Sequence, residues 1–213
     1  MEKINLKSAR SLPPEHAFVQ SIPPRREVSS IASYFAFLFG VLALAAISSP
    51  AQTVHPTEYQ VKAAYLYNFG KFVRWQSDRV ANSGPLEICV LGKDPFGMVL
   101  DSTVAGDSID GRKITVGRVS SVQQAAPCSI LFISSSEDKQ LSSILAAAAD
   151  LGLLTVSDIA NFAERGGAVG FVTQQERIRF EVNRDAAQRS HLVLSSELLK
   201  VASKVIGKGG PQN

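Results

Sequence analysis

The two cysteines are the residues of this chain best suited to chemistry. An even number of cysteines favours a disulfide in an oxidising compartment, so Cys89 and Cys128 are candidates for one bridge. Two buried free thiols on neighbouring strands are the alternative. A zinc site is disfavoured, because two cysteines without a histidine near them in the sequence do not complete a tetrahedral set of ligands.

Motifs of catalysis are missing from the sequence. It contains no Gly-x-Ser-x-Gly nucleophile elbow, no phosphate-binding loop of the P-loop type and no Gly-x-Gly-x-x-Gly. His191 has no acidic or cysteine neighbour at the spacing of metal ligands, and His16 and His55 lie in or beside a predicted leader. We therefore expect no enzymatic activity, no metal site and no cofactor.

Polar candidates for binding lie in the second half of the chain. Asp158 follows an apolar run that predicts a buried strand, and α/β proteins bind ligands at that end of a strand. Polar and apolar residues alternate over 177–183, which places Arg179, Glu181 and Asn183 on one face of a strand. Helix capping by Asp158 and an ordinary solvated strand face are the structural alternatives.

Aromatic residues gather in the first predicted helix. Thr57 can cap a helix over 57–75, because apolar residues recur there at spacings of three and four. Tyr65, Phe69 and Trp75 lie in this segment, and they predict either a packed stripe of the core or a surface for a ligand or partner.

The elements that would position these residues alternate along the chain. Helices are predicted from Asp94 onward, over 138–151, over 159–164, over 184–190 and over 195–206. Strands are predicted at 86–91, 114–116, 129–133, 153–156, 168–173 and 178–183, and the last two form an antiparallel hairpin. The sequence thus predicts a single three-layer α/β domain, with a mixed, mostly parallel sheet and helices on both faces.

The first 51 residues are predicted to be an export leader. Residues 31–47, IASYFAFLFGVLALAAI, carry no charge, Arg25 and Arg26 precede them, and Ser49 and Ala51 suit a signal peptidase. Cleavage after Ala51 would leave residues 52–213, with 207–213 as a loose tail. A retained membrane anchor is the alternative, although 17 residues are slightly few for a span.

The charge balance argues against nucleic acid as a partner. The chain has 22 basic and 19 acidic residues, and five of the basic ones lie in the leader. Residues 52–213 therefore lack the basic surplus that displaces counterions from phosphate.

Six stretches together resemble the YfiR family of exported bacterial regulators. They run in order from residue 58 to residue 202: EYQVKAAYLYNFGKFVRW, ICVLGKDPFG, GRKITV, CSILFISSSE, LTVSDIANFAERGGAVGFV and RFEVNRDAAQRSHLVLSSELLKVA. The combination is specific, whereas each stretch alone is not.

The resemblance implies a periplasmic, non-enzymatic α/β protein that forms a homodimer. The founding member of the family binds the periplasmic sensing domain of an inner-membrane diguanylate cyclase and restrains it, which limits cyclic di-GMP and biofilm formation. A characteristic family disulfide joins positions that match Cys89 and Cys128. The founding member's second cysteine pair is missing here.

Two functional hypotheses follow. The first is an exported regulator that binds a membrane sensor and holds it inactive. The sensor would be a diguanylate cyclase or a histidine kinase. Arg189 joins the residues named above as a candidate contact. The second is a periplasmic receptor for a small ligand, in a pocket lined by Tyr65, Phe69, Trp75 and the face of Arg179 and Glu181.

Overall fold

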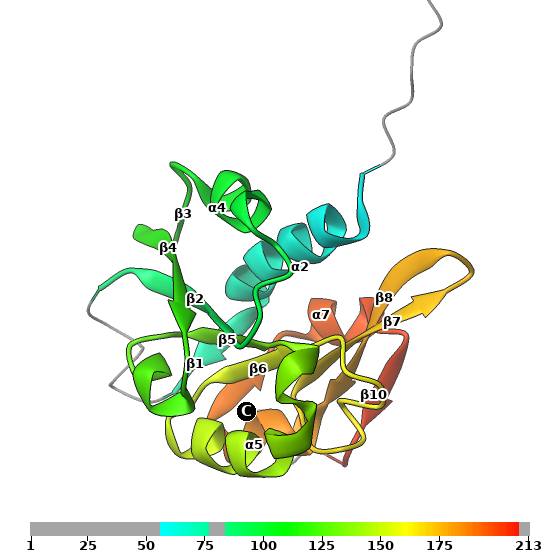
Figure 1. The fold of residues 1–213 in the computed structure, drawn as a ribbon. Helices are drawn as coiled ribbons and strands as arrows, with labels where there is room; N and C mark the ends of the chain where they lie inside the picture. Colours follow the sequence, from blue (N-terminus) through cyan, green and yellow to red (C-terminus); the bar gives the residue numbers. More distant parts are fainter. Residues whose placement is uncertain (1–55, 77–83, 209–213) are drawn as a thin grey trace, which may run out of the picture. The chain divides into compact units, whose positions relative to one another are not determined.

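The computed structural model describes residues 56–76 and 84–208 of the chain (Figure 1). The predicted leader, its apolar segment and its cleavage site lie outside the described residues, as does most of the predicted C-terminal tail. No helix of the described part is both long and apolar enough to cross a membrane.

The first described helix, α2 (Glu58–Phe72), begins at a complete capping box. The Thr57 hydroxyl accepts from the Gln60 backbone amide, and the Gln60 side chain accepts from the amide of Thr57. The helix ends earlier than predicted, because Val73 adopts an extended conformation. Strand β1 (Val73–Trp75) follows and pairs antiparallel with β9 (Leu192–Leu194), which the sequence did not predict.

An eight-stranded mixed sheet forms the centre of the part of the chain that the structure describes. Its order is β10-β8-β7-β6-β5-β2-β4-β3, and only the β7–β8 and β3–β4 pairs are antiparallel. The strands are β2 (Leu86–Leu91), β3 (Ser108–Ile109), β4 (Arg112–Val119), β5 (Ile130–Ile133), β6 (Leu154–Ser157), β7 (Val169–Gln174), β8 (Arg177–Asn183) and β10 (Lys204–Ile206). The predicted fold class is confirmed, including the hairpin of β7 and β8.

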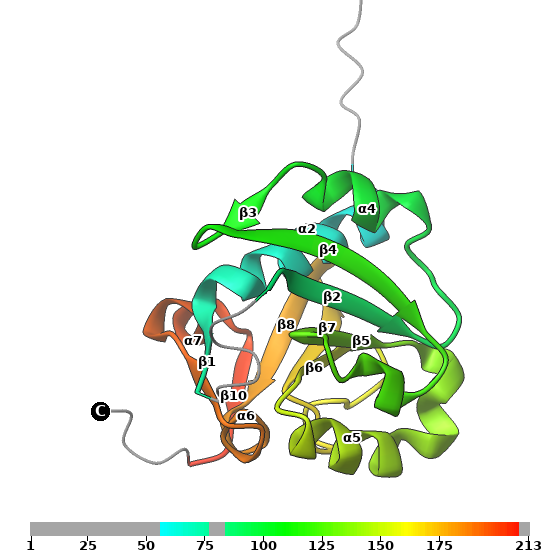
Figure 2. The same cartoon turned by 90° about the vertical axis from the view of Figure 1, so that its left-hand side faces the viewer.

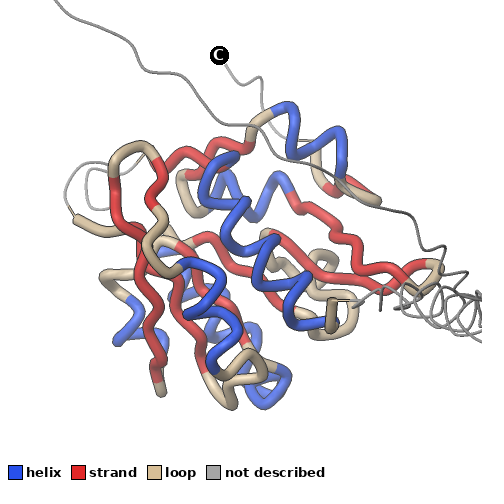
Figure 3. Tube along the Cα trace, turned by 90° about the horizontal axis from the view of Figure 1, so that it is seen from above, coloured by secondary structure: helices blue, strands red, loops and turns tan. Residues whose placement is uncertain are grey.

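Helices cover the two faces of the sheet (Figures 1 and 2). Alternate strand residues such as Ile88 and Phe132 pack with α2 and α4 (Met98–Val104), whereas Leu131 and Ile133 pack with α5 (Leu141–Asp150). Seen from above, helices lie in front of the strands (Figure 3). The short helices α6 (Arg184–Arg189) and α7 (Ser196–Val201) flank the last strands. Two 3₁₀ segments, η2 (Val122–Ala125) and η3 (Ser135–Gln140), complete the elements of the described residues.

Three predicted helices differ from the structure. The helix after β2 starts at Met98 rather than Asp94, since the Asp94 carboxylate accepts from the Phe96 amide and holds a turn there. Residues 159–164 form turns, and Asn161 there has a φ of 57° that ends any helix. The predicted helix over 138–151 begins as the 3₁₀ segment η3 and becomes α-helical only at Leu141.

The predicted last helix is also shorter, because its end is a strand. Helix α7 stops at Val201, where Ala202 becomes extended. The Ser203 amide then donates to the Phe180 carbonyl, which starts the parallel pairing of β10 with β8. Residues 204–206 therefore form an edge strand of the sheet.

Candidate functional site

The two cysteines form a disulfide, so this prediction is confirmed. Cys89 lies on β2, Cys128 lies just before the adjacent strand β5, and their Cα atoms are 6.0 Å apart. Both residues are buried on the α5 side of the sheet. Gly117 on the neighbouring strand β4 leaves room for the bridge, because a Cβ atom there would lie 3.1 Å from the Cys89 sulfur.

Asp158 belongs to a charged cluster at the carboxyl end of β6. Its Oδ2 accepts from the Lys62 ammonium at 2.6 Å and from the Tyr59 hydroxyl at 3.1 Å. Lys62 also pairs with Glu58, one turn earlier on α2, and its side chain is only 3% exposed. The cluster thus ties the start of α2 to the segment that follows β6.

Burial and pairing act on Lys62 in opposite directions. Burial favours the neutral amine, but the hydrogen bonds to Asp158 and Glu58 together outweigh it and raise the pKa of Lys62 above the usual lysine value. Lys62 therefore stays charged. Sequence reasoning missed this residue, and the only sequence signal is the Glu58–Lys62 spacing of four on one helix face.

The three candidate binding residues of β8 have separate surroundings. Asn183 is buried and caps α6: its side-chain oxygen accepts from the Ala186 amide, and its side-chain nitrogen donates to the Ala163 carbonyl. Arg179 is exposed and donates to the Val201 carbonyl at 3.4 Å. Glu181 is half-buried opposite Lys204 of β10.

The aromatic candidates Tyr65 and Trp75 lie in different places. The Tyr65 ring contacts Phe69, Phe171 and Phe180 in the core on the α2 side of the sheet. Arg179 and Glu181 alternate with the buried Phe180 and so lie on the other side.

Trp75 lies apart from Tyr65. It donates its indole hydrogen to the Ser129 carbonyl and borders a cavity of about 440 Å³ with Gly70 and Arg112. The structure therefore does not bring the lining of the predicted ligand pocket together.

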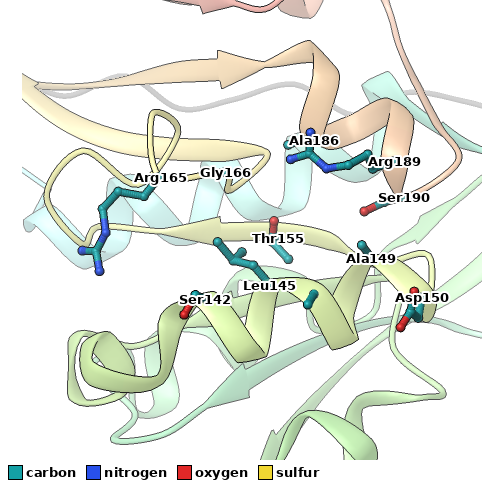
Figure 4. A pocket seen from close by; sticks show the side chains of 11 residues that line it. Ser142, Leu145, Ala149, Asp150, Thr155, Arg165, Gly166, Ala186, Arg189 and Ser190 are labelled. Atoms are coloured by element: carbon teal, nitrogen blue, oxygen red, sulfur yellow. The ribbon is translucent and has the colours of Figure 1, made fainter.

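Arg189 lines a groove of about 530 Å³ between α5 and α6 (Figure 4). The α5 wall consists of Ser142, Leu145, Ala146, Ala149 and Asp150. Thr155 of β6 lies between the walls, and the opposite side consists of Arg165, Gly166, Ala186, Arg189 and Ser190. Sequence reasoning named only Arg189 of this set.

Comparison with known proteins gives a family and a fold. The model of the YfiR/HmsC-like family matches residues 59–203, and members of this family are periplasmic regulators of diguanylate cyclase signalling rather than catalysts. Among curated proteins, none matches this chain.

Two solved structures are similar. One is a conserved domain protein of Vibrio cholerae O1 biovar eltor, with 10% identity, a TM-score of 0.50, and coverage of 70% of this chain and 60% of that chain. The other is the ABC domain in complex with L-Trp from Streptococcus pneumoniae, with 13% identity, a TM-score of 0.43, and coverage of 57% and 55%. This chain thus spans less than two thirds of either protein, and the first likeness shows the fold alone. The match over 59–203 shows that the chain belongs to the YfiR/HmsC-like family.

Proposed function

We propose that this protein is exported to the periplasm, where it binds the outer domain of an inner-membrane diguanylate cyclase and holds that enzyme inactive. The observation that carries the proposal is the family match over residues 59–203, since the family consists of periplasmic regulators of this signalling. The buried disulfide supports the location, because such bonds persist in oxidising compartments.

The proposed mechanism is binding without chemistry. A regulator shifts a sensor toward its inactive state only by the difference between its affinities for the two states. Moving a sensor from 1% to 99% inactive requires a difference of about 10⁴-fold in affinity. The protein therefore has to contact a surface of the sensor that changes between the two states.

The proposal includes a homodimer. Support comes from the outer edge of the sheet, where within residues 56–76 and 84–208 β10 pairs with β8 alone. Val205 of β10 is 43% exposed and is close in sequence to the exposed Val201. An exposed sheet edge with apolar side chains is a surface that a second copy can cover. Sedimentation equilibrium of the purified protein measures its oligomeric state, and a monomer at all concentrations would contradict this part of the proposal.

The test of the regulatory function is made in the native host. Deleting the gene is expected to raise cyclic di-GMP, measured by mass spectrometry of cell extracts, and the complete chain supplied in trans is expected to restore the normal level. A chain that starts at Gln52 and lacks the leader serves as the control for export, because it is expected to stay in the cytoplasm and fail to restore.

The partner is identified in the same strains. Crosslinking in intact cells, followed by affinity purification of the tagged protein, is expected to recover a membrane diguanylate cyclase. Recovery of a histidine kinase, with its phosphorylation output changed by the deletion and cyclic di-GMP unchanged, would contradict the cyclase as the partner. Unchanged cyclic di-GMP together with unchanged sensor output would contradict the regulatory function itself.

A further inference from the structure

We infer that the groove between α5 and α6 is a binding site for a small organic anion with an apolar body. The inference goes beyond the proposed regulatory function and does not depend on it, because it concerns a site within one chain. It rests on the size of the groove, on two arginines at its rim and on the apolar surface between them.

The size and origin of the groove fit a small molecule. Its volume of about 530 Å³ lies within the range of roughly 300–1,000 Å³ that is usual for small-ligand sites. The groove exists because the α5 side chains that face it are mostly small, including Ala146 and Ala149. Gly166 lines the opposite side with a φ of 102°, which favours glycine, and so adds no side chain to fill the space.

Two guanidinium groups provide the charge that would select an anion. Arg189 extends from α6 toward Gly166, where a Cβ atom on the glycine would lie 3.8 Å from the Arg189 Nη2 (Figure 4). Among residues 56–76 and 84–208, the exposed side chain of Arg189 has no ion-pair or hydrogen-bond partner. A planar guanidinium with free donors binds a carboxylate or phosphate group through two hydrogen bonds.

Arg165 lines the same groove and pairs with Asp138. Its Nη1 lies 2.6 Å from the Asp138 Oδ1, so that one carboxylate orients the guanidinium and partly offsets its charge. Asp150 lies at another end of the groove, and Arg189 points away from it (Figure 4). The anionic group is therefore expected near Arg189 and Gly166, away from the repulsion of Asp150.

The surface between the two arginines is apolar with a few hydroxyl groups. The Leu145 side chain is half-buried, and its Cδ1 would lie 3.8 Å from a Cβ atom on Gly166. Thr155, in the floor, accepts a hydrogen bond from the Ala168 amide, so its hydroxyl hydrogen is available to a ligand. An apolar body can cover Leu145 and the alanines while its charged group meets Arg189.

Isothermal titration calorimetry of the oxidised protein, purified from the host, tests the inference. The probes are phenylacetate and phenylphosphate, and phenylacetamide is the neutral match. We expect saturable one-to-one binding of at least one anion and at least tenfold weaker binding of the amide. Arg189→Gln is expected to weaken anion binding at least tenfold.

Arg177→Gln is the matched control, because Arg177 is an exposed arginine on the hairpin, outside the groove. It is expected to bind the anion as the unchanged protein does. NMR shifts of the Ala146 and Ala149 methyl groups, followed in the same titration, locate the ligand independently of any change in stability.

Four results would overturn the inference. They are no saturable binding of either anion, equal binding of phenylacetamide, equal weakening by Arg189→Gln and Arg177→Gln, and shifts that map away from the groove. Binding of an acidic peptide such as hexaglutamate without binding of either small anion would also overturn it, in favour of a protein partner. None of these results depends on whether a sensor is bound.

Discussion

A buried lysine needs negative partners, and in this structure Lys62 has two. Asp158 and Glu58 both pair with it, while their own side chains are 16% and 53% exposed. Breaking a buried ion pair by removing one partner is strongly destabilising, because the remaining charge stays in a place with little water. The cluster is thus a stability element whichever partner the protein binds.

The first prediction concerns this ion pair. Asp158→Asn is expected to lower the free energy of unfolding by about 3 kcal/mol, because it leaves the Lys62 ammonium with Glu58 alone. Adding Lys62→Met is expected to recover part of that loss, as the uncompensated charge is then gone. Urea unfolding followed by circular dichroism measures both. Lys204→Met breaks the exposed pair with Glu164 and serves as the control, for which little change is expected.

The second prediction concerns alkaline pH. Burial is the main cause that raises the pKa of Tyr59, and the charge of Asp158 is the next. The hydrogen bonds of Lys62 to Asp158 and Glu58 outweigh its burial and raise the pKa of Lys62. Both groups thus hold their protons more tightly in the folded state, so their stabilisation is complete below about pH 10 and is lost as the pH rises through the raised pKa values.

Urea unfolding at several pH values between 8 and 11 measures this loss. Tyr59→Phe and Lys62→Met are each expected to make the decline shallower than in the unchanged protein. Absorbance at 295 nm follows tyrosine ionisation directly, and a late-titrating component is expected to disappear in Tyr59→Phe. An identical decline in both variants would show that the cluster does not cause it.

Among the elements, the segment between β2 and α4 depends on one arginine of β4. Arg118 bonds both Asp101 oxygens at 2.6 and 2.9 Å, Asp94 at 3.0 Å and the Gly97 carbonyl at 2.7 Å. The hydrogen bond from Arg118 is the main reason why the pKa of Asp101 is lower than usual. The stability that this bond contributes is therefore lost as the pH falls through the lowered pKa.

The third prediction is that Arg118→Lys loosens this segment without unfolding the protein. A lysine ammonium cannot make the forked pair with Asp101 and reach Gly97 at the same time. Amides of residues 93–101 are expected to exchange hydrogen several-fold faster, measured by mass spectrometry, while those of β5 and β6 keep their rates. Equally faster exchange in all strands would instead indicate global destabilisation.

The fourth prediction concerns the tip of the β7–β8 hairpin. Gln175 and Glu176 have φ values of 50° and 59°, the left-handed region that a two-residue turn of type I′ requires. Replacing them with Asn and Gly is expected to raise the free energy of unfolding by about 1 kcal/mol, because these residues adopt that conformation at lower cost. Thermal and urea unfolding measure the gain, and Gln174→Asn next to the turn is the control. Loss of stability would show that the native side chains make contacts that matter more.

Sequence patterns predicted the elements that are long and buried. The strand β5 is a continuous apolar run, β2 and β6 are almost fully buried, and polar and apolar residues alternate along β8 of the hairpin. The strands β9 and β10 have three residues each, too few for a period, and β10 follows directly on a helical pattern. Their pairing is decided by distant residues, which local patterns do not contain: β9 pairs with β1, and β10 pairs with β8 next to Phe180.

Fewer residues of the candidate sites could be predicted, because these sites also combine residues that are distant in the sequence. Asp158 could be named because the end of a buried strand is a recognisable place in the sequence. Lys62 could not, because a lysine on a helix is usually solvated, and its partner Asp158 lies 96 residues away. The α5–α6 groove combines residues from four separate segments, which become neighbours only when the sheet forms.

At the scale of the whole molecule, the disulfide connects two neighbouring central strands of the sheet. It joins the start of β5 to β2 across a loop of 39 residues and lies inside the cluster packed under α5. In the chain-entropy model, a loop of this length stabilises the folded state by about 4 kcal/mol. Typical domains have a total stability of about 5–15 kcal/mol, so the bridge is a large part of it.

The fifth prediction follows from that comparison. Replacing Cys89 and Cys128 together by serine is expected to lower the free energy of unfolding by about 4 kcal/mol, measured by urea unfolding without reductant. Valine at both positions is the matched variant, because it avoids placing hydroxyl groups at two buried positions that are at most 1% exposed. If the missing bridge alone causes the destabilisation, the free energy of unfolding is expected to fall by similar amounts in both variants and in the reduced unchanged protein. If the native host shows raised cyclic di-GMP with the valine variant at unchanged protein level, the bridge is needed for the proposed binding of a sensor. If cyclic di-GMP rises only as the amount of folded protein falls, the bridge acts on regulation through stability alone.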